Sequence, residues 1–483
     1  MLTIERILEI FEEYAAVPHV SGHTRRARDF ICRRAEELGL AYTADDHDNV
    51  IIRKSASPGC DKAAVVILQG HLDMVGDTAP GVTFDFLREG IRVIRDGNRL
   101  RADGTTLGAD NGIAVALMLA ILEDRTLQHP ALEAVFTSDE ETGLLGASAL
   151  DTSLLTGRLL INLDSEDEGI LTAGCAGGAA MRAVFPCRRV PAAGAVFTLT
   201  IDGLRGGHSG QMIGEGRGNA VKLLARLLCL LEDRKTYHLL SVKGGTKDNA
   251  IPMTASAVIA VDPGDEDGLR ALCLAFEKDI RRELAGRDDL SVRITGISPH
   301  EADDILAGGA LSDEDRQRLL AFLTSLPYGV LSREKDPSLI RTSANPGILT
   351  TGRTEATIVT SVRSSLESER CAVCDRIRRL AGALGAACTE EGTYPAWQFR
   401  EDSPLRTAMC RLWREMTGHD MVVDVIHAGL ECGIFDSNLP GLDAVSIGPA
   451  MSDIHTYRES LDIASTARLA AYLEKLLSCL AEA

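Results

Sequence analysis

The stretch Val65–Leu68 constrains the fold more than any other, because its apolar residues run directly into Gln69-Gly70-His71-Leu72-Asp73. A continuous apolar run that ends at a glycine is typical of a buried strand in a parallel sheet. In α/β proteins the carboxyl ends of such strands carry the chemistry. A histidine two residues before an aspartate can bind a metal through one ring nitrogen while the carboxylate orients the ring. The stretch predicts an α/β sheet and a candidate metal ligand, with an ordinary polar loop edge as the alternative.

Two further apolar segments, 132–136 and 159–163, also lead into carboxylates. Glu140 and Glu141 follow the first segment, and Asp164 follows the second. Adjacent residues after a strand cannot both point the same way, so one glutamate can bind a metal while the other faces a substrate as a general base. A solvated acidic loop is the alternative for the two glutamates. The repetition favours a parallel sheet with its chemistry on one edge.

Asp110 lies in the glycine-flanked turn 108–112, directly before a helix expected over 113–122. Aspartate is a common helix N-cap, which is the alternative for this residue. Glycines on both sides of it suit a close approach of the backbone to something bound. With His455 near the C-terminus, two histidines and three carboxylates form a candidate ligand set for two divalent ions such as Zn²⁺. The candidate ligands are His71, Asp110, Glu141, Asp164 and His455.

The length of 483 residues exceeds what one hydrophobic core accommodates, so more than one domain is expected. The α/β pattern occupies residues 1–184 and returns in 394–483, which predicts a discontinuous catalytic domain with a mostly parallel central sheet flanked by helices. The middle region, 185–393, alternates strands and helices in the manner of an inserted α+β domain. We expect this insert to act as a lid and dimerisation domain.

Charge and composition exclude several classes of partner. The net charge of −19 argues against binding to nucleic acid or to an anionic membrane surface. No apolar run reaches the length of a membrane span, and the first residues lack the basic and apolar regions of a signal peptide. The 12 cysteines include a single CxxC pair, Cys371 and Cys374, so we expect reduced thiols in a cytoplasmic protein.

Taken together, the motifs resemble those of the co-catalytic zinc aminopeptidase/carboxypeptidase/aminoacylase family, over nearly the whole chain and in the same order. The branch that looks most similar is that of the aminoacyl-histidine dipeptidases, the bacterial cytosolic nonspecific or beta-alanyl-histidine dipeptidases. The motifs that carry the resemblance are QGHLDMV, GADNG, SDEETG, NLD, GGHSG, NAIP, HAGLE and DIHTYRE.

The resemblance implies two Zn²⁺ per subunit, although Co²⁺ or Mn²⁺ also suits these ligands. His71 and Asp164 would share one ion, Glu141 and His455 would share the other, and Asp110 would bridge the two. Two ions a few ångströms apart can lower the pKa of a shared water and polarise a carbonyl.

The resemblance also implies catalytic roles. Asp73 would orient His71, and Glu140 would be the general base that passes a proton to the leaving amine. His208 of GGHSG would reach the active site of the other subunit in a homodimer and stabilise the oxyanion. From the residues alone, His208 could equally be a turn histidine.

Substrate contacts follow from the same resemblance. Asn249 of NAIP and Arg363 would hold the carboxylate end of the substrate, and Gly429 of HAGLE would offer backbone contact. Asn249 could instead cap a turn, and Arg363 could pair with a surface acid, with Arg353 as a rival for its role. Two positions depart from the family pattern, Met253 after NAIP and Tyr457 after the ligand His455, so side-chain preference is open.

The leading hypothesis is a metallo-dipeptidase that hydrolyses unblocked dipeptides, including Xaa-His dipeptides. An aminoacylase or an N-carbamoyl-amino-acid amidohydrolase on the same scaffold is the alternative enzyme. The acidic residues Asp139 and Glu166 to Glu168 near the expected site would favour a substrate with a free amine. A binding protein that has lost activity predicts a missing ligand or base, yet every position is filled in this sequence.

Overall fold

The computed structural model describes residues 2–482 and divides into two compact units. The first unit contains the residues up to Cys175, then Trp397–Ile426 and the residues from Leu430 onward. The second unit contains Ala176–Ala396 and His427–Gly429. A division at residue 185 would cut through β9 (Gly177–Pro186), which belongs to the second unit.

The main sheet of the first unit has the strand order β1-β2-β6-β3-β7-β23-β8-β22. Neighbours at its centre, β6, β3, β7 and β23, run parallel, whereas β1, β2 and β6 pair antiparallel. The strands are β1 (Ala41–Ala44), β2 (Val50–Lys54), β3 (Val66–His71), β6 (Leu132–Thr137), β7 (Leu159–Asn162), β8 (Ile170–Cys175), β22 (Val422–Ile426) and β23 (Asp443–Ser446).

The parallel centre places the predicted strand ends beside one another. All residues of β3 and β6 are buried, as their continuous apolar sequence predicts. In the register, His71 lies opposite Thr137, and Gln69 lies opposite Asn162. The three strands that precede the predicted ligands therefore end at the same edge of the sheet.

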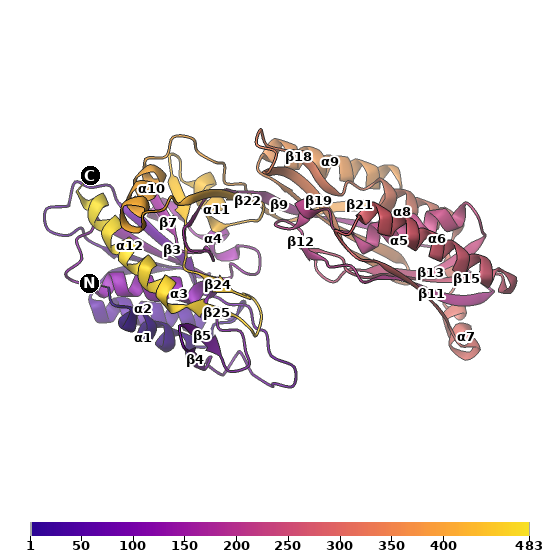
Figure 1. Ribbon diagram of the computed structural model, residues 1–483, viewed down its shortest axis with the longest axis horizontal. Helices are drawn as coiled ribbons and strands as arrows, with labels where there is room; N and C mark the ends of the chain where they lie inside the picture. The colour runs from indigo at the N-terminus through magenta and orange to yellow at the C-terminus, as the bar shows by residue number, and fades with distance from the viewer. Residues whose placement is uncertain (1, 483) are drawn as a thin grey trace. The chain divides into compact units, whose positions relative to one another are not determined.

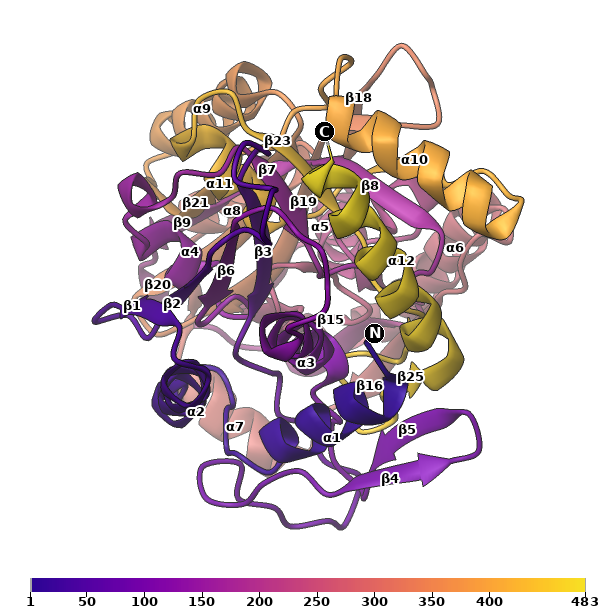
Figure 2. The same ribbon diagram turned by 90° about the vertical axis from the view of Figure 1, so that its left-hand side faces the viewer.

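Helices cover both faces of this sheet. The apolar helix α3 packs against α1 and β3, and its sides are buried all round because it lies inside the core. Figure 2 shows α3 and α12 on one side of the central strands, with α4 and α11 on the other. The helices are α1 (Ile4–Ala15), α2 (Arg25–Leu38), α3 (Ala109–Glu123), α4 (Leu145–Ala149), the 3₁₀ turn η1 (Thr152–Leu154), α10 (Pro404–Thr417), α11 (Glu431–Asn438) and α12 (Ile463–Ala481).

A small second sheet in the first unit has the order β24-β25-β5-β4. It pairs residues near the C-terminus with a hairpin that precedes α3, so the loop between β24 and β25 lies beside the start of α3. The strands are β4 (Val93–Asp96), β5 (Arg99–Ala102), β24 (Met451–Ser452) and β25 (Ser460–Asp462).

The second unit is built on an antiparallel sheet with the order β16-β11-β15-β13-β19-β20-β9-β21, to which β18 adds beside β19. Short ribbons pair β10 with β17 and β12 with β14. The strands are β9 (Gly177–Pro186), β10 (Arg189–Val190), β11 (Ala195–Asp202), β12 (Gly207–His208), β13 (Tyr237–Gly244), β14 (Ala250–Ile251), β15 (Ala255–Val261), β16 (Ser291–Gly296), β17 (Ala310–Leu311), β18 (Gly329–Arg333), β19 (Ile340–Thr351), β20 (Glu355–Ser364) and β21 (Ala387–Tyr394).

Helices of the second unit lie along one face of this sheet, where they share its apolar core (Figure 1). They are α5 (Ala220–Glu232), α6 (Glu266–Leu284), α8 (Asp313–Ser325) and α9 (Glu367–Ala383), together with the outlying α7 (Pro299–Ala307) and the 3₁₀ turns η2 (Ile213–Glu215) and η3 (Pro263–Asp265). The predicted combination of an α/β unit and an inserted α+β unit is confirmed. Within the described residues, no helix combines the length and the apolar character needed to cross a membrane.

Candidate metal centre

The five predicted metal ligands lie together in the first unit. Three follow the parallel strands: His71 ends β3, Glu141 comes after β6 and Asp164 comes after β7. Asp110 lies at the start of α3, and His455 lies in the loop between β24 and β25. Segments almost 400 residues apart thus converge on one edge of the sheet.

His71 faces two carboxylates at one end of the cluster. Its Nε2 lies 3.2 Å from Oδ1 of Asp110 and 3.4 Å from Oδ1 of Asp164. The His71 ring is buried, with 1% of the side chain exposed. Two oxygens this close to one ring nitrogen match the spacing of ligands around a single ion.

His455 faces two carboxylates at the other end. Its Nε2 lies 3.0 Å from Oδ2 of Asp110 and 2.8 Å from Oε1 of Glu141. Unlike His71, His455 keeps 45% of its side chain exposed. Asp110 turns one oxygen to each histidine, which is the geometry of a carboxylate that bridges two ions.

The donors fit divalent cations better than they fit one another. A ring nitrogen carries at most one proton, so neither histidine can donate to both of the carboxylates it faces. Oε1 of Glu141 is buried, with Nε2 of His455 as its close polar neighbour at 2.8 Å. Atoms of His71, Asp110 and Glu141 lie within 4.8 Å of one another and could hold an ion. Nitrogen and carboxylate donors of this kind suit Zn²⁺, Mn²⁺ or Co²⁺.

The electrostatics of the cluster agree with this interpretation. Burial lowers the pKa of His455, but the contacts with Asp110 and Glu141 outweigh it and raise that pKa to about 11. Burial also lowers the pKa of His71, and the charge of Asp164 with the contact to Asp110 raises it well above its usual value. The carboxylates thus demand positive charge at both ring positions, which a cation supplies.

Asp73 is buried next to His71, and it contacts the backbone of nearby residues as well as the His71 ring. Nδ1 of His71 lies 3.0 Å from the main-chain oxygen of Asp73 and 3.4 Å from its Oδ1. The carboxylate also accepts the backbone N–H groups of Glu140 and Glu141, at 2.9 and 3.3 Å, and the hydroxyl of Ser21. It therefore positions the backbone of both predicted functional glutamates.

Glu140 lies in the loop after β6, and its backbone N–H donates to the carboxylate of Asp73. Burial raises the pKa of its carboxyl well above the usual value, and the charges of Asp164, Glu141 and Glu431 raise it further. His71 acts in the opposite direction. A carboxyl group in such surroundings holds a proton more readily than an exposed carboxyl group does, as a general base requires.

Asn111 joins the strand ends to the turn that carries Asp110. Its Oδ1 accepts the backbone N–H of His71 at 3.1 Å, and its Nδ2 donates to the carbonyl of Leu163 at 2.8 Å. This bridge requires Gly70, because a methyl group there would lie 2.4 Å from Oδ1 of Asn111. The glycine of QGHLD thus permits the close approach of α3 to β3.

Glu459 is a functional neighbour that the sequence did not single out. It is 1% exposed, and its Oε2 accepts the N–H groups of Leu107 and Gly108 at 2.8 and 2.9 Å. Its Oε1 accepts the N–H of Asp110 at 3.1 Å. One carboxylate, four residues after His455, therefore holds the whole turn of Asp110. Its only signal in the sequence is its place in the motif DIHTYRE.

Two further carboxylates lie beside the cluster. Glu431 begins α11 fully buried and accepts hydrogen bonds from Gln69 at 2.6 Å and Thr137 at 2.7 Å. Burial, then the charges of Asp110 and Asp164, raises the pKa of Glu166 to about 7. The sequence analysis includes the acidic loop around Glu166, whereas the only sequence signal for Glu431 is its place in the motif HAGLE.

The other predicted residues, His208, Asn249, Arg363 and Gly429, belong to the second unit. Nη2 of Arg363 lies 3.5 Å from Nε2 of His208, and Nη1 donates to the hydroxyl of Tyr394 at 2.6 Å. A methyl group at Gly429 would meet the same tyrosine ring at 2.6 Å. The carbonyl of Asn249 accepts the N–H of the residue after His208 at 2.8 Å, and its side chain is exposed.

Sequence reasoning missed two partners of this second cluster. Tyr394 is the last residue of β21, and it lies in none of the motifs identified in the sequence. His427 of HAGLE is buried, and its Nε2 lies 2.7 Å from the hydroxyl of Ser343. The second unit thus gathers two histidines, an arginine and a tyrosine from distant segments.

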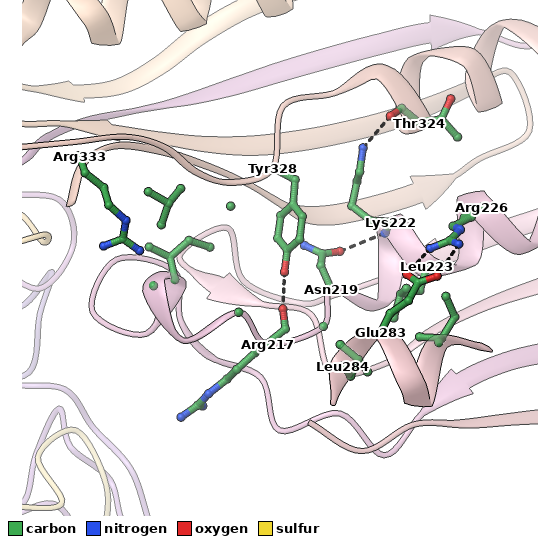
Figure 3. Close-up of a pocket in the computed structure, with 17 residues that line it drawn as sticks. Arg217, Asn219, Lys222, Leu223, Arg226, Glu283, Leu284, Thr324, Tyr328 and Arg333 are labelled. Carbon is green, nitrogen blue, oxygen red and sulfur yellow. Dashed lines mark hydrogen bonds and ion pairs between the residues drawn. The ribbon is translucent and has the colours of Figure 1, made fainter. Parts of the chain in front are cut away.

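A cavity of about 580 Å³ elsewhere in the second unit contains no comparable chemistry (Figure 3). Its charged groups are satisfied by the protein. Arg226 pairs with Glu283 at 2.6 Å, and Lys222 donates to carbonyls at the end of α8, that of Leu323 at 2.7 Å. The hydroxyl of Tyr328 donates to the carbonyl of Arg217 at 2.6 Å. Because these polar groups bind one another, we assign the cavity lining a structural role.

Comparison with known proteins agrees with the geometry of the metal cluster. Residues 67–478 match Peptidase family M20/M25/M40. The chain is 35% identical over 481 residues to the cytosol non-specific dipeptidase of Escherichia coli (strain K12), covering 99% of this chain and 98% of that protein. The crystal structure of an aminoacylhistidine dipeptidase from Vibrio alginolyticus superposes with a TM-score of 0.84 at 33% identity, covering 99% of this chain and 97% of that one.

A more distant structure shares the fold alone. A tripeptidase from Staphylococcus aureus superposes with a TM-score of 0.58 at 16% identity, over the full length of both chains. The architecture therefore persists where most of the sequence differs.

Proposed function

We propose the reaction of this chain from the premise that it belongs to Peptidase family M20/M25/M40. The family match confirms the predicted class of metallopeptidase. We infer that the substrates are unblocked dipeptides, including Xaa-His dipeptides, and that the products are two amino acids. The names of the relatives from Escherichia coli and Vibrio alginolyticus support this substrate class.

One observation carries the proposal, namely the position of Asp110 between two histidines at 3.2 and 3.0 Å. On each side of Asp110 a histidine faces a second carboxylate, and the two pairs share no residue. This arrangement favours two ions, most simply Zn²⁺, with Co²⁺ or Mn²⁺ also suitable. His71 and Asp164 would hold one ion, and His455 and Glu141 the other. Bound there, the metal supplies polarisation of the scissile carbonyl and a lowered pKa for the attacking water.

Glu140 takes the proton of the attacking water and returns it to the leaving amine. Its high pKa, caused by burial and by neighbouring carboxylates, suits a group that must hold that proton between the two steps. Asp73 acts as a positioning residue, because its carboxylate holds the backbone of both Glu140 and Glu141.

The second unit supplies the contacts to the rest of the substrate. We assign the carboxylate end of the dipeptide to Arg363, Asn249 and the backbone at Gly429. His208 serves as the oxyanion donor and acts in the site of a partner subunit within a homodimer formed through the second unit. The location is cytoplasmic, as the name of the relative from Escherichia coli suggests for that protein.

Substitution of the two adjacent glutamates tests the assignment of base and ligand. Glu140→Gln should keep the wild-type metal content and lower kcat by about 10²–10⁴-fold, the usual contribution of a general base. Glu141→Gln, the matched control, should lose metal instead, because it removes the partner of His455. Metal content by elemental analysis and turnover of alanyl-histidine measure both effects. Normal turnover in Glu140→Gln, or metal loss equal to that of Glu141→Gln, would contradict the assignment.

A mixed dimer tests whether His208 acts across subunits. His208→Ala and Glu140→Ala are each expected to be nearly inactive when expressed alone. After subunits are mixed, one of the two sites in each heterodimer contains both wild-type residues, so activity should return toward one quarter of the wild-type value. Activity that stays at the level of the single variants, with heterodimers demonstrated by tag capture, refutes action across the interface.

A further inference from the structure

Arg363 differs in its partners from two other buried arginines of the second unit. Arg316 and Arg370 are 7% and 3% exposed, and each pairs with two carboxylates. Arg363 is 7% exposed, yet it forms no ion pair within the described residues. Its Nε is buried and has no hydrogen-bond partner in this part of the chain. A buried guanidinium without a counter-ion is unfavourable until an anion arrives, which suits the substrate carboxylate assigned to it above.

A tyrosine hydroxyl contacts the guanidinium where a carboxylate would be expected. Nη1 of Arg363 donates to the hydroxyl of Tyr394 at 2.6 Å, and Nη2 lies 3.5 Å from Nε2 of His208. A neutral hydroxyl can orient a guanidinium without cancelling its charge. The contact with Tyr394 therefore fixes a direction for Arg363 and leaves its positive charge to a ligand.

Three adjacent strands, in the order β20-β9-β21, produce this contact. Gly178 of β9 is the register partner of Arg363 on one side and of Tyr394 on the other. Residues directly opposite one another point to the same face of a sheet. Because the middle position has no side chain, the Tyr394 ring can lie across β9 and reach Arg363. A methyl group at Gly178 would lie 2.3 Å from the Tyr394 hydroxyl, so this arrangement requires glycine.

Two further features confine the Tyr394 ring. A methyl group at Gly429 would lie 2.6 Å from Cε2 of the ring, so the ring packs closely against a second glycine. The register of β21 against β9 also shifts between Glu391 and Tyr394. An irregularity of this kind changes the direction of the side chain that follows it. The tyrosine thus occupies a defined place beside Arg363.

We propose that Tyr394 is a positioning residue whose hydroxyl directs the Arg363 guanidinium toward the terminal carboxylate of the dipeptide. This inference rests on the function proposed above, because it requires that Arg363 binds that carboxylate. An arginine side chain loses conformational freedom when it binds a ligand, and the bond to Tyr394 removes part of that freedom beforehand. The expected consequence is a stronger preference for a free carboxylate over a carboxylate blocked as an amide.

The test compares Tyr394→Phe with the matched control Tyr328→Phe, since each keeps the ring and removes one hydroxyl. The hydroxyl of Tyr328 donates to the carbonyl of Arg217 at 2.6 Å in the same unit. The substrates are alanyl-histidine and alanyl-histidinamide. Tyr394→Phe should raise KM for alanyl-histidine about 10-fold, near the lower end of what a hydrogen bond to a charged group contributes, with kcat changed much less. The kinetic constants for the amide should change little, and the control should match the wild type.

Two further variants separate positioning from a general structural role. In the background of Arg363→Ala, Tyr394→Phe should have no additional effect on KM, because the hydroxyl acts through the guanidinium. Gly178→Ala adds a methyl group that would meet the hydroxyl, so it should reproduce the rise in KM. It also tests the proposal if Tyr394→Phe does not fold. Urea unfolding verifies that each variant is folded before its kinetics are measured.

The outcomes separate this inference from the proposed function. Wild-type protein that fails to cleave alanyl-histidine despite bound metal refutes the proposed function. Wild-type cleavage with no preference for the free acid over the amide overturns the role of Arg363 and this inference with it. A preference that is unchanged in Tyr394→Phe overturns the role of Tyr394 and leaves the function intact. A rise in KM of the same size in the Arg363→Ala background also overturns it, because the hydroxyl would then act independently of Arg363.

Discussion

Replacement of Glu459 by glutamine tests how the turn that carries Asp110, the proposed bridging ligand, is held. The Glu459 carboxylate accepts three backbone N–H groups, those of Leu107, Gly108 and Asp110, at 2.8, 2.9 and 3.1 Å. An amide in the same place has a single acceptor oxygen, which can serve the first two groups. Its NH₂ group then faces the N–H of Asp110, donor against donor.

The size of the effect follows from these three bonds. A hydrogen bond to a charged group contributes about 1.5–3 kcal/mol, and a neutral one about 1 kcal/mol. Glu459→Gln loses one charged bond and weakens two others, so the free energy of unfolding of the first unit should fall by about 3 kcal/mol. Because Asp110 is then free to shift, metal affinity should also fall, by about 10–100-fold, as is usual when a support of a metal ligand is lost.

The matched control is Glu133→Gln. Glu133 is also buried and its carboxylate accepts the backbone N–H groups of Thr156 and Gly157, each at 3.0 Å, but it lies near the opposite end of β6 from the ligands. Burial raises the pKa of Glu459 to about 7, so the carboxylate is charged above that pH. Urea unfolding of the metal-free proteins above that pH gives the loss of stability, and competition with a chromogenic chelator gives metal affinity. Both variants should lose stability, and only Glu459→Gln should lose metal affinity. Equal metal affinity in Glu459→Gln and wild type, or an equal loss in the control, would refute the reasoning.

Two further predictions concern close packing and pH. Gly70→Ala should destabilise the protein by about 1–3 kcal/mol and weaken metal binding, because the added methyl group displaces Asn111, whereas Gly264→Ala, in open space, should leave both measured quantities unchanged. Burial, followed by nearby positive charges, lowers the pKa of His427 to about 3. The pKa of a histidine in the unfolded chain is about 6.5, so the contribution of His427 to the free energy of unfolding is fully present above that pH. This contribution is lost on acidification, by about 2 kcal/mol between about pH 7 and 5. His427→Gln should flatten this part of the pH dependence of urea unfolding, and an unchanged slope would refute it.

The sequence predicted the parts of the structure that depend on local pattern. Continuous apolar runs identified β3, β6 and β7, and the rule that parallel strands end at a common edge brought His71, Glu141 and Asp164 together. Gly39 ends α2 with a left-handed φ of 68°, a conformation that favours glycine at a helix C-terminus. Each of these features can be predicted from the residues of a single segment.

Pairing between distant segments was beyond this reasoning. The contact of Glu459 with the turn of Asp110 joins residues 349 positions apart, and neither periodicity nor spacing indicates it. His427 and Ser343 are likewise brought together only by the tertiary fold, across 84 positions. Helix α11 is short and begins at Glu431, which is buried in the structure. Because a glutamate in a sequence usually indicates an exposed position, the sequence did not indicate that this helix packs on the sheet.

The two halves of the metal cluster rest on different kinds of backbone. His71 and Asp164 follow regular strands, where the sheet fixes their direction. Asp453 and His455 instead have φ of 53° and 59°, a left-handed conformation that costs free energy for residues other than glycine. Such a conformation persists only where the surroundings hold it, and Glu459, four residues after His455, ties this loop to the start of α3 through backbone hydrogen bonds. A buried carboxylate outside the proposed ligand set is therefore as much a part of the site as the proposed ligands, because Glu459 holds the loop of His455 against the turn of Asp110.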